Sequence, residues 1–312
     1  LMGLPFDAVT TSQAVEKIET SITEQSACFL STPNLNFVIA SESDEAFFES
    51  VIESDLVVAD GMPIVWVAKL LGIPISERVA GSSLFNELSS KKKVKRKLKV
   101  FFFGGLPGVA ETAHDVLNLT SEGMSCCGFH DPGFVSVDEM SSSEEIDKIN
   151  AAEPDFLVVA LGAKKGQVWI QKNKNVLKTS VVSHLGAVIN FVAGTVDRAP
   201  DVWQKMGLEW LWRIKQEPAL WRRYFIDGSQ FFKLFLFNII PLWLFKKCLS
   251  GLGEIHDHDI VVSNEQTGST IFMAGKIEIS QRDHIVDCFR SVRDQFSGNV
   301  VIDCTNLEYL DS

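Results

Sequence analysis

Short apolar runs alternate with amphipathic segments over the first two hundred residues of the chain. The runs are Cys28–Leu30, Asp55–Ala59, Lys99–Phe103, Asp155–Leu161 and Ser180–Ser183, and each ends near a turn that contains glycine or proline. Continuous apolar strands of this kind are typical of a parallel sheet that helices cover on both faces. The pattern therefore predicts an α/β core over residues 1–200, with a mostly parallel sheet.

Between these runs, apolar residues recur at helical spacing. Thr11 or Ser12 is a suitable N-cap for a helix through Val15, Ile18 and Ile22. The segment from about residue 37 to 52 has the same periodicity and predicts one further helix.

Residues 201–228 predict two helices rich in tryptophan and arginine, separated near Glu217-Pro218. The stretch 198–250 holds nine bases and four acids, and five of the seven tryptophans lie in it. We therefore expect residues 201–250 to form a basic, aromatic helical appendage to the core.

The end of this appendage carries the most apolar run in the chain, residues 231–245. A membrane-spanning helix needs about 20 apolar residues. The run is shorter than that, and Lys233, Asn238 and Pro241 interrupt it. The combination of aromatic and basic residues favours an interfacial helix or hairpin on a membrane surface. A core helix, an oligomer contact and a true span are the alternatives.

The tail of the chain, residues 255–312, differs from the appendage in its acidic composition and its predicted strands. After a linker at 251–253, the pattern predicts strands near 259–263 and 270–273, a helix around 285–296 and a strand at 299–304. Residues 251–312 hold eleven acids and four bases. We expect a separate small α/β module here.

Composition narrows the class of protein. With 46% hydrophobic and 22% charged residues, the 312-residue chain can bury a sizeable core and is not a disordered protein. The net charge of −11 argues against a nucleic-acid partner. The six cysteines form no CxxC pair, which favours reduced thiols in the cytoplasm.

Polar residues follow two of the predicted strands, at Thr32–Asn36 and at Asp60-Gly61. In parallel α/β sheets such turns open onto one cleft. A desolvated carboxylate at Asp60 could accept a proton from an attacking hydroxyl. A helix cap is an equally open interpretation of Asp60. Arg78 could hold a phosphate through its planar fork, or pair with an acid such as Glu77.

Two glycine-bearing turns follow two other strands. They contain Gly104 and Gly105, and Gly162 with Lys164, Lys165 and Gln167. Glycines between a strand and a helix bring backbone amides towards an anion such as a diphosphate. Each turn alone could also be only a tight connection. His184 ends a strand, and no cluster of His, Cys and carboxylate residues suggests a metal site.

Eight segments occur in an order that resembles the WecG/TagA/CpsF glycosyltransferase family over about residues 3–228. They are TPNLN, DGMP, ERVAGSSLF, FFFGGLPGVAE, PDFLVVALGA, AGTVDRAP, GLEWLWR and EPALWRR. The resemblance implies a Rossmann-like fold and a hexosyltransferase. Its substrate would be a UDP-sugar carrying N-acetylmannosamine or its uronic acid. Its acceptor would be a polyprenyl-diphosphate-linked glycan, in cell-surface polysaccharide biosynthesis.

The same resemblance assigns roles to individual residues. It makes Asp60 the catalytic base of an inverting displacement, with Thr32 and Asn34 at the active-site strand end. Arg78, Gly104, Gly105, Gly162 and Gln167 would bind the donor, and Arg213, Arg222 and Arg223 would close over the site at the membrane. The family's glutamine falls on Gly166, so Gln167 is offset by one position. Asn190 stands where the family often has aspartate.

The implied setting is the cytoplasmic face of the plasma membrane, with the protein peripheral to it. No cofactor is implied, and the reaction is expected to be independent of metal.

Residues 298–312 resemble part of a STAS domain, the fold of anti-sigma-factor antagonists. This implies a regulatory protein partner and makes Ser312 a candidate phosphosite. It also leaves an alternative open, a non-catalytic regulator that senses a sugar nucleotide and acts through the STAS-like module. A dinucleotide-binding enzyme is disfavoured because the glycine spacing is wrong for one.

Overall fold

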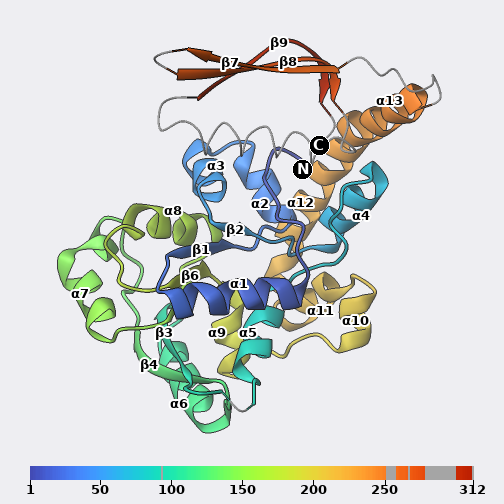
Figure 1. Ribbon diagram of the computed structural model, residues 1–312. Helices are drawn as coiled ribbons and strands as arrows, with labels where there is room; N and C mark the ends of the chain where they lie inside the picture. The colour runs from blue at the N-terminus through green and yellow to red at the C-terminus, as the bar shows by residue number, and fades with distance from the viewer. Residues whose placement is uncertain (93, 251–257, 266–267, 278–299, 311–312) are drawn as a thin grey trace. The chain divides into compact units, whose positions relative to one another are not determined.

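Six parallel strands form the centre of the first of two compact units in the computed structural model, Leu1–Ile239 (Figure 1). The strands are β1 (Cys28–Ser31), β2 (Leu56–Val57), β3 (Leu98–Gly104), β4 (Met124–His130), β5 (Phe156–Ala160) and β6 (Val181–His184). Their order across the sheet is β2-β1-β6-β5-β3-β4. The predicted α/β fold with a parallel sheet is confirmed. The structure describes residues 1–92, 94–250, 258–265, 268–277 and 300–310.

Helices cover both faces of this sheet (Figure 1). One face packs against α1 (Thr11–Glu24), α5 (Gly81–Ser89), α6 (Val109–Thr120) and α9 (Gly186–Val192). The other packs against α2 (Leu35–Ser41), α3 (Glu45–Ile52), α4 (Met62–Leu71), α7 (Ser143–Ala151) and α8 (Ala163–Asn173). Side chains alternate along β3, so Phe102 enters the first layer while Phe101 and Phe103 enter the second. This explains why the central strands are apolar at every position.

The structure differs from the sequence pattern at one helix and one strand. The helix expected over residues 37–52 is two helices, α2 and α3, because Asp44 caps the second one and its Oδ1 accepts a hydrogen bond from the Phe47 N–H at 3.1 Å. Strand β4 was not predicted. It lies at the sheet edge and is only partly buried, so it lacks the continuous apolar run of the central strands.

The appendage begins with α10 (Asp201–Lys205) and α11 (Glu209–Gln216), followed by the short 3-10 helix η2 (Pro218–Leu220). The predicted break near Glu217-Pro218 is confirmed. Helix α12 (Trp221–Leu234) and the π-helical turn η3 (Phe235–Ile239) follow. These residues belong to the same unit as the sheet.

Helix α12 is held against α2 by a polar contact. The Asn36 side-chain amide donates to both carboxylate oxygens of Asp227, at 3.3 and 3.2 Å. Asp227 is only 6% exposed. A buried carboxylate keeps its place only with such partners, so this contact fixes the appendage over the core.

The second unit, Ile240–Ser312, contains α13 (Ile240–Ser250) and three strands. Strand β7 (His258–Glu265) pairs antiparallel with β8 (Gly268–Ile277), which pairs in parallel with β9 (Val300–Leu310). The three strands predicted in the tail are therefore confirmed, each longer than expected. The helix predicted at 285–296 and Ser312 lie outside the described residues.

Replacing Phe102 with alanine tests the core of the first unit. The ring is fully buried between the sheet and its helices, so we expect the free energy of unfolding to fall by about 3–5 kcal/mol. Urea unfolding followed by tryptophan fluorescence measures this. The control is Leu119→Ala on α6, where the side chain is 85% exposed and the change should stay below about 0.5 kcal/mol. Equal losses in both variants would contradict this description of the core.

Candidate active site

A cavity of about 800 Å³ opens at the carboxyl ends of the strands. The turns that follow β1, β2, β3, β5 and β6 all contribute to its lining, and α11 and α12 close one side. Its volume lies in the range of small-molecule sites. The location agrees with the rule that ligands of open α/β sheets bind beyond the carboxyl ends of the strands.

The topology of the sheet marks one crevice within this cavity. Strands β3 and β5 are neighbours, yet the chain leaves β3 towards β4 and leaves β5 in the opposite direction towards β6. Ligands of α/β proteins bind at such switch points. Gly105 and Gly162, which follow these two strands, both line the cavity. No side chain caps the N-terminus of α8 after Gly162, which leaves its first amides for an anion.

Gly104 does not line the cavity. It instead shapes the turn that follows β3. Its φ is +93°, and a Cβ there would lie 2.8 Å from the carbonyl oxygen of Ala160. The next amide, of Gly105, donates to that same carbonyl at 2.9 Å. Glycine at 104 thus allows the end of β3 to approach Ala160 of β5 closely with a positive φ.

Asp60 follows β2 and lines the cavity. Its backbone N–H donates to the carbonyl of Pro33 at 2.9 Å, which joins the two polar turns predicted to meet. The Gly81 N–H, the first of α5, donates to Asp60 Oδ2 at 3.3 Å. The sequence left two interpretations of Asp60 open, a helix cap and a cavity carboxylate. The side chain fits both, since it contacts the N-terminus of α5 and also faces the cavity.

Burial raises the pKa of Asp60 to about 6, since the charged form loses hydration. The nearby Arg78 guanidinium opposes this rise, and Glu209 adds to it. At neutral pH the carboxylate is mostly ionised, yet it is a stronger base than an ordinary aspartate. This combination suits a group that must accept a proton from an alcohol.

Arg78 joins Asp60 to the appendage. Its Nε lies 3.8 Å from Asp60 Oδ1, and its Nη1 lies 2.7 Å from Glu209 Oε2 of α11. The Arg78 side chain is 13% exposed and lines the cavity. The acids that pair with Arg78 are thus Asp60 and Glu209 rather than Glu77. Glu209 is a cavity residue that the sequence did not single out.

Thr32 and Asn34 lie beside Asp60 in the cavity wall. The Asn34 side-chain oxygen Oδ1 caps α2 by accepting from the Phe37 N–H at 3.3 Å. Its amide nitrogen has no hydrogen-bond partner among the described residues. The same holds for the Thr32 hydroxyl, so both groups remain available to a ligand.

Two of the three predicted arginines of the appendage reach the cavity. Arg213 lines it and pairs with Glu217 at 2.6 Å, and Arg223 lines it beside Tyr224. Arg222 does not line it, and its guanidinium lies over the Trp221 ring instead. Lys165, at the start of α8, adds a further cation to the lining.

Gln167 is also absent from the lining. It is fully buried on α8, and its Nε2 donates to Ser31 Oγ at 2.6 Å. Position 166 is glycine because the His184 ring occupies the space beside it, and a Cβ there would lie 2.4 Å from His184 Cδ2. The structure therefore places Gln167 in the core beside β1, outside the cavity lining.

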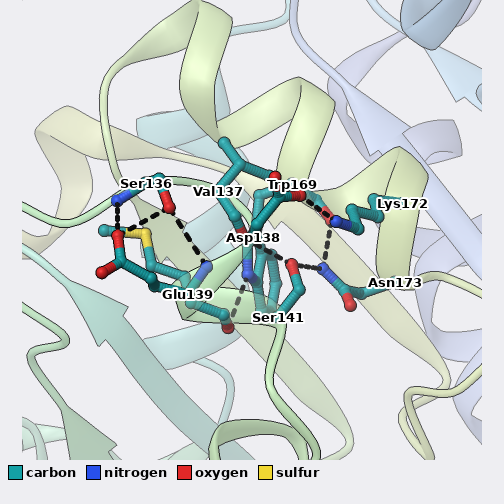
Figure 2. Close-up of polar contacts among 9 residues, drawn as sticks. Ser136, Val137, Asp138, Glu139, Ser141, Trp169, Lys172 and Asn173 are labelled. Carbon is teal, nitrogen blue, oxygen red and sulfur yellow. Dashed lines mark hydrogen bonds and ion pairs between the residues drawn. The ribbon is translucent and has the colours of Figure 1, made fainter.

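The loop between β4 and α7 forms the far wall and is pinned to α8 (Figure 2). The Trp169 indole N–H donates to the Met140 carbonyl at 3.0 Å, and the Asn173 amide donates to Ser141 Oγ at 2.8 Å. Lys172 pairs with Asp138. Met140 lines the cavity, so these contacts fix one of its walls.

No group of three or more His, Cys, Asp or Glu side chains capable of holding a metal occurs in the part of the chain that the structure describes. The cavity cations are instead Arg78, Arg213, Arg223 and Lys165. The lining also holds four acids, Asp60, Asp131, Glu209 and Asp227, so the four cations are local partners for an anionic ligand within a mixed-charge site.

The family model for the glycosyl transferase WecG/TagA/CpsF family matches residues 1–243 of the chain. A protein of Bacillus spizizenii is 31% identical over 210 residues, which cover 67% of this chain and 79% of that relative. Proteins of two Staphylococcus aureus strains are 27% identical over 241 residues, covering 77% of this chain and 91% of each. All three are named N-acetylglucosaminyldiphosphoundecaprenol N-acetyl-beta-D-mannosaminyltransferase.

The charge coupling around Asp60 can be measured directly. Glu209→Gln removes a negative charge that raises the pKa of Asp60, so this pKa should fall below about 6. Arg78→Gln removes the opposing positive charge, so the pKa should rise above about 6. Carboxyl ¹³C NMR titration, with the Asp60 signal assigned by its loss in Asp60→Asn, gives both values.

Glu217→Gln is the matched control, because Glu217 pairs with Arg213 at the other end of the same helix. It should leave the Asp60 titration unchanged. Shifts of the same sign in the Glu209 and Arg78 variants would contradict the coupling.

Proposed function

Since the chain belongs to the WecG/TagA/CpsF family of glycosyltransferases, we propose that it moves an N-acetylhexosamine from a UDP donor to a polyprenyl-diphosphate-linked glycan. The transferred sugar is N-acetylmannosamine or its uronic acid. The acceptor class follows the names of the relatives, which act on N-acetylglucosaminyldiphosphoundecaprenol. The observation that carries the proposal is Asp60, a carboxylate with a raised pKa in a cavity lined by cations.

The proposed reaction is a single displacement. Asp60 accepts the proton of the acceptor hydroxyl as its oxygen forms a bond to the anomeric carbon, and the bond from that carbon to the UDP oxygen breaks. The configuration at the anomeric carbon is inverted. Since the pKa of Asp60 is about 6, the base form is lost as the pH falls through that value.

The leaving UDP carries negative charge that must be stabilised. Gly105, Gly162 and the uncapped N-terminus of α8 offer backbone amides at the switch point. Arg213, Arg223 and Lys165 offer cationic side chains along the same cavity. We propose that these groups stabilise the leaving diphosphate without a resident metal or other cofactor.

The outer surface of the appendage supports a position on the membrane. Trp221, Phe225, Phe232 and Phe237 are 52 to 71% exposed on α12 and η3, while Asp227 and Ile239 on the inner side are buried. Arg222 and Lys233 lie on the same helix. Exposed aromatic rings beside cations are typical of interfacial helices. A lipid-linked acceptor would then meet the cavity at the cytoplasmic face of the plasma membrane.

By length and composition, one helix among the described residues, Pro218–Leu244, could cross a membrane, with a mean hydropathy of 1.2. The contact of Asp227 with Asn36 holds the α12 part of this helix against the core. We therefore propose that it lies on the membrane surface rather than across the bilayer.

The tail 255–312 lies beyond the family match, which ends at residue 243. Its resemblance to a STAS domain, a regulatory partner for it and phosphorylation of Ser312 stay predictions. The alternative of a non-catalytic sensor is disfavoured, because the relatives of this chain are named as enzymes.

Asp60→Asn tests the base. The amide keeps the shape of the carboxyl group and can still accept from the Gly81 N–H, but it cannot accept a proton. We expect turnover to fall about 100- to 10,000-fold with UDP-sugar affinity retained. UDP release with a polyprenyl-diphosphate-linked N-acetylglucosamine acceptor measures turnover, and titration calorimetry measures binding. Asp115→Asn, on the exposed side of α6, is the control. Near-normal turnover of Asp60→Asn would rule out this role.

Serine at Phe225, Phe232 and Phe237 together tests the membrane surface. These rings are exposed, so the fold should be unaffected, whereas their transfer into lipid is favourable. We expect co-sedimentation with phosphatidylglycerol-containing vesicles to weaken about tenfold or more. Leu119→Ser removes an apolar side chain that is 85% exposed on α6, outside the cavity, and serves as the control. Unchanged sedimentation of the triple variant would exclude the interfacial role.

A further inference from the structure

His184 is the last residue of β6 and lines the cavity. Strand β6 lies between β1 and β5. On the β1 side the cavity holds Thr32, Asn34 and, after β2, Asp60. On the β5 side it holds the glycine turns at Gly162 and Gly105. The imidazole thus lies between the proposed base and the amides suited to a diphosphate.

Neither ring nitrogen of His184 has a hydrogen-bond partner among the described residues. Nε2 is covered from solvent, and the Phe37 ring lies on one side with its centroid 6.4 Å away. Burial lowers the pKa of His184 to about 4, so the ring is neutral at physiological pH. A neutral imidazole has one N–H donor and one acceptor nitrogen, and a buried polar atom left unpaired costs stability. An imidazole kept in such a position is suited to a ligand that completes its hydrogen bonds.

Two glycines make room for this ring. A Cβ at Gly166 would lie 2.4 Å from His184 Cδ2, and a Cβ at Gly186 would lie 3.2 Å from Nε2. Neither glycine has a positive φ. They are therefore required by the close approach of the imidazole rather than by their own backbone conformation. Any side chain at position 166 would force the His184 ring to shift from this position.

The His184 ring is neutral, and this decides whether it suits the diphosphate or the sugar of a UDP-sugar. A neutral imidazole adds no positive charge that would attract a diphosphate. The backbone amides and cationic side chains of the cavity already favour that group. Its donor and acceptor match the hydroxyl and acetamido groups of a hexosamine. The sugar of a UDP donor must also lie between its diphosphate and the base, which is the position of His184 along the sheet edge.

We propose that His184 contacts the transferred hexosamine of the sugar nucleotide and helps to determine which sugar is accepted. This inference rests on the proposed function, since it takes a UDP-hexosamine as the ligand of the cavity. The contact is a hydrogen bond between the imidazole and a hydroxyl or acetamido group.

Binding measurements separate the sugar from the nucleotide. In His184→Ala, affinity for UDP-N-acetylmannosamine should fall roughly 10- to 100-fold, while affinity for UDP should stay within about twofold. Titration calorimetry gives both values. His184→Gln, which retains a donor and an acceptor, should recover part of the lost affinity. His114→Ala, on α6 outside the cavity, is the matched control and should leave both affinities unchanged.

Gly166→Ala is an independent second variant. Its methyl group should displace the His184 ring and weaken UDP-N-acetylmannosamine binding without any change at His184 itself. Thermal unfolding confirms that each variant is folded. Equal losses for UDP and for the UDP-sugar, or no loss in folded His184→Ala, would overturn the inference. Failure of the proposed function has a different signature, because the unmodified protein would then bind UDP-N-acetylmannosamine no better than UDP and release no UDP from it.

Discussion

A partly buried carboxyl group beside a guanidinium sets the arrangement of this active site. Asp60 loses hydration in the cavity wall, and its position is tolerable because Arg78 and the first amide of α5 partly compensate. Glu209 pairs with Nη1 of Arg78 and so limits how far Arg78 stabilises the charged form of Asp60. A bare Asp–Arg pair would favour a weak base. The charge of Glu209 adds to the raised pKa of Asp60, which suits the base role proposed for it.

Glu209 also makes the site dependent on the appendage. It belongs to α11, and the buried Asp227 of α12 bonds to Asn36 in the core. Two polar contacts therefore tie the helices that carry the exposed aromatic surface to the turns that carry the chemistry. The exposed aromatic surface proposed to meet lipid and the carboxylate proposed as the base are held in one compact unit. This suits an enzyme whose acceptor has one end in the membrane.

The family match and the structure together divide the chain into the glycosyltransferase and its C-terminal tail. The match covers residues 1–243 and includes every residue that lines the cavity. The three-stranded sheet of the second unit lies beyond it. Within the cavity, the neutral His184 and the glycine beside it are the features of this chain that the base mechanism does not use.

The sequence by itself determined the parallel α/β core, because unbroken apolar runs such as that of β3 leave no other way to bury both faces. It also placed Asp60, Thr32 and Gly162 at one edge, since parallel strands end together. Only the tertiary structure decided which side chains meet across that edge. Glu209 reaches Arg78 from a helix more than a hundred residues away, and Gln167 turns into the core beside β1 although its neighbours suggested a ligand. Periodicity fixes which face of an element is buried. The pairing of polar groups depends on how elements dock, which no local pattern records.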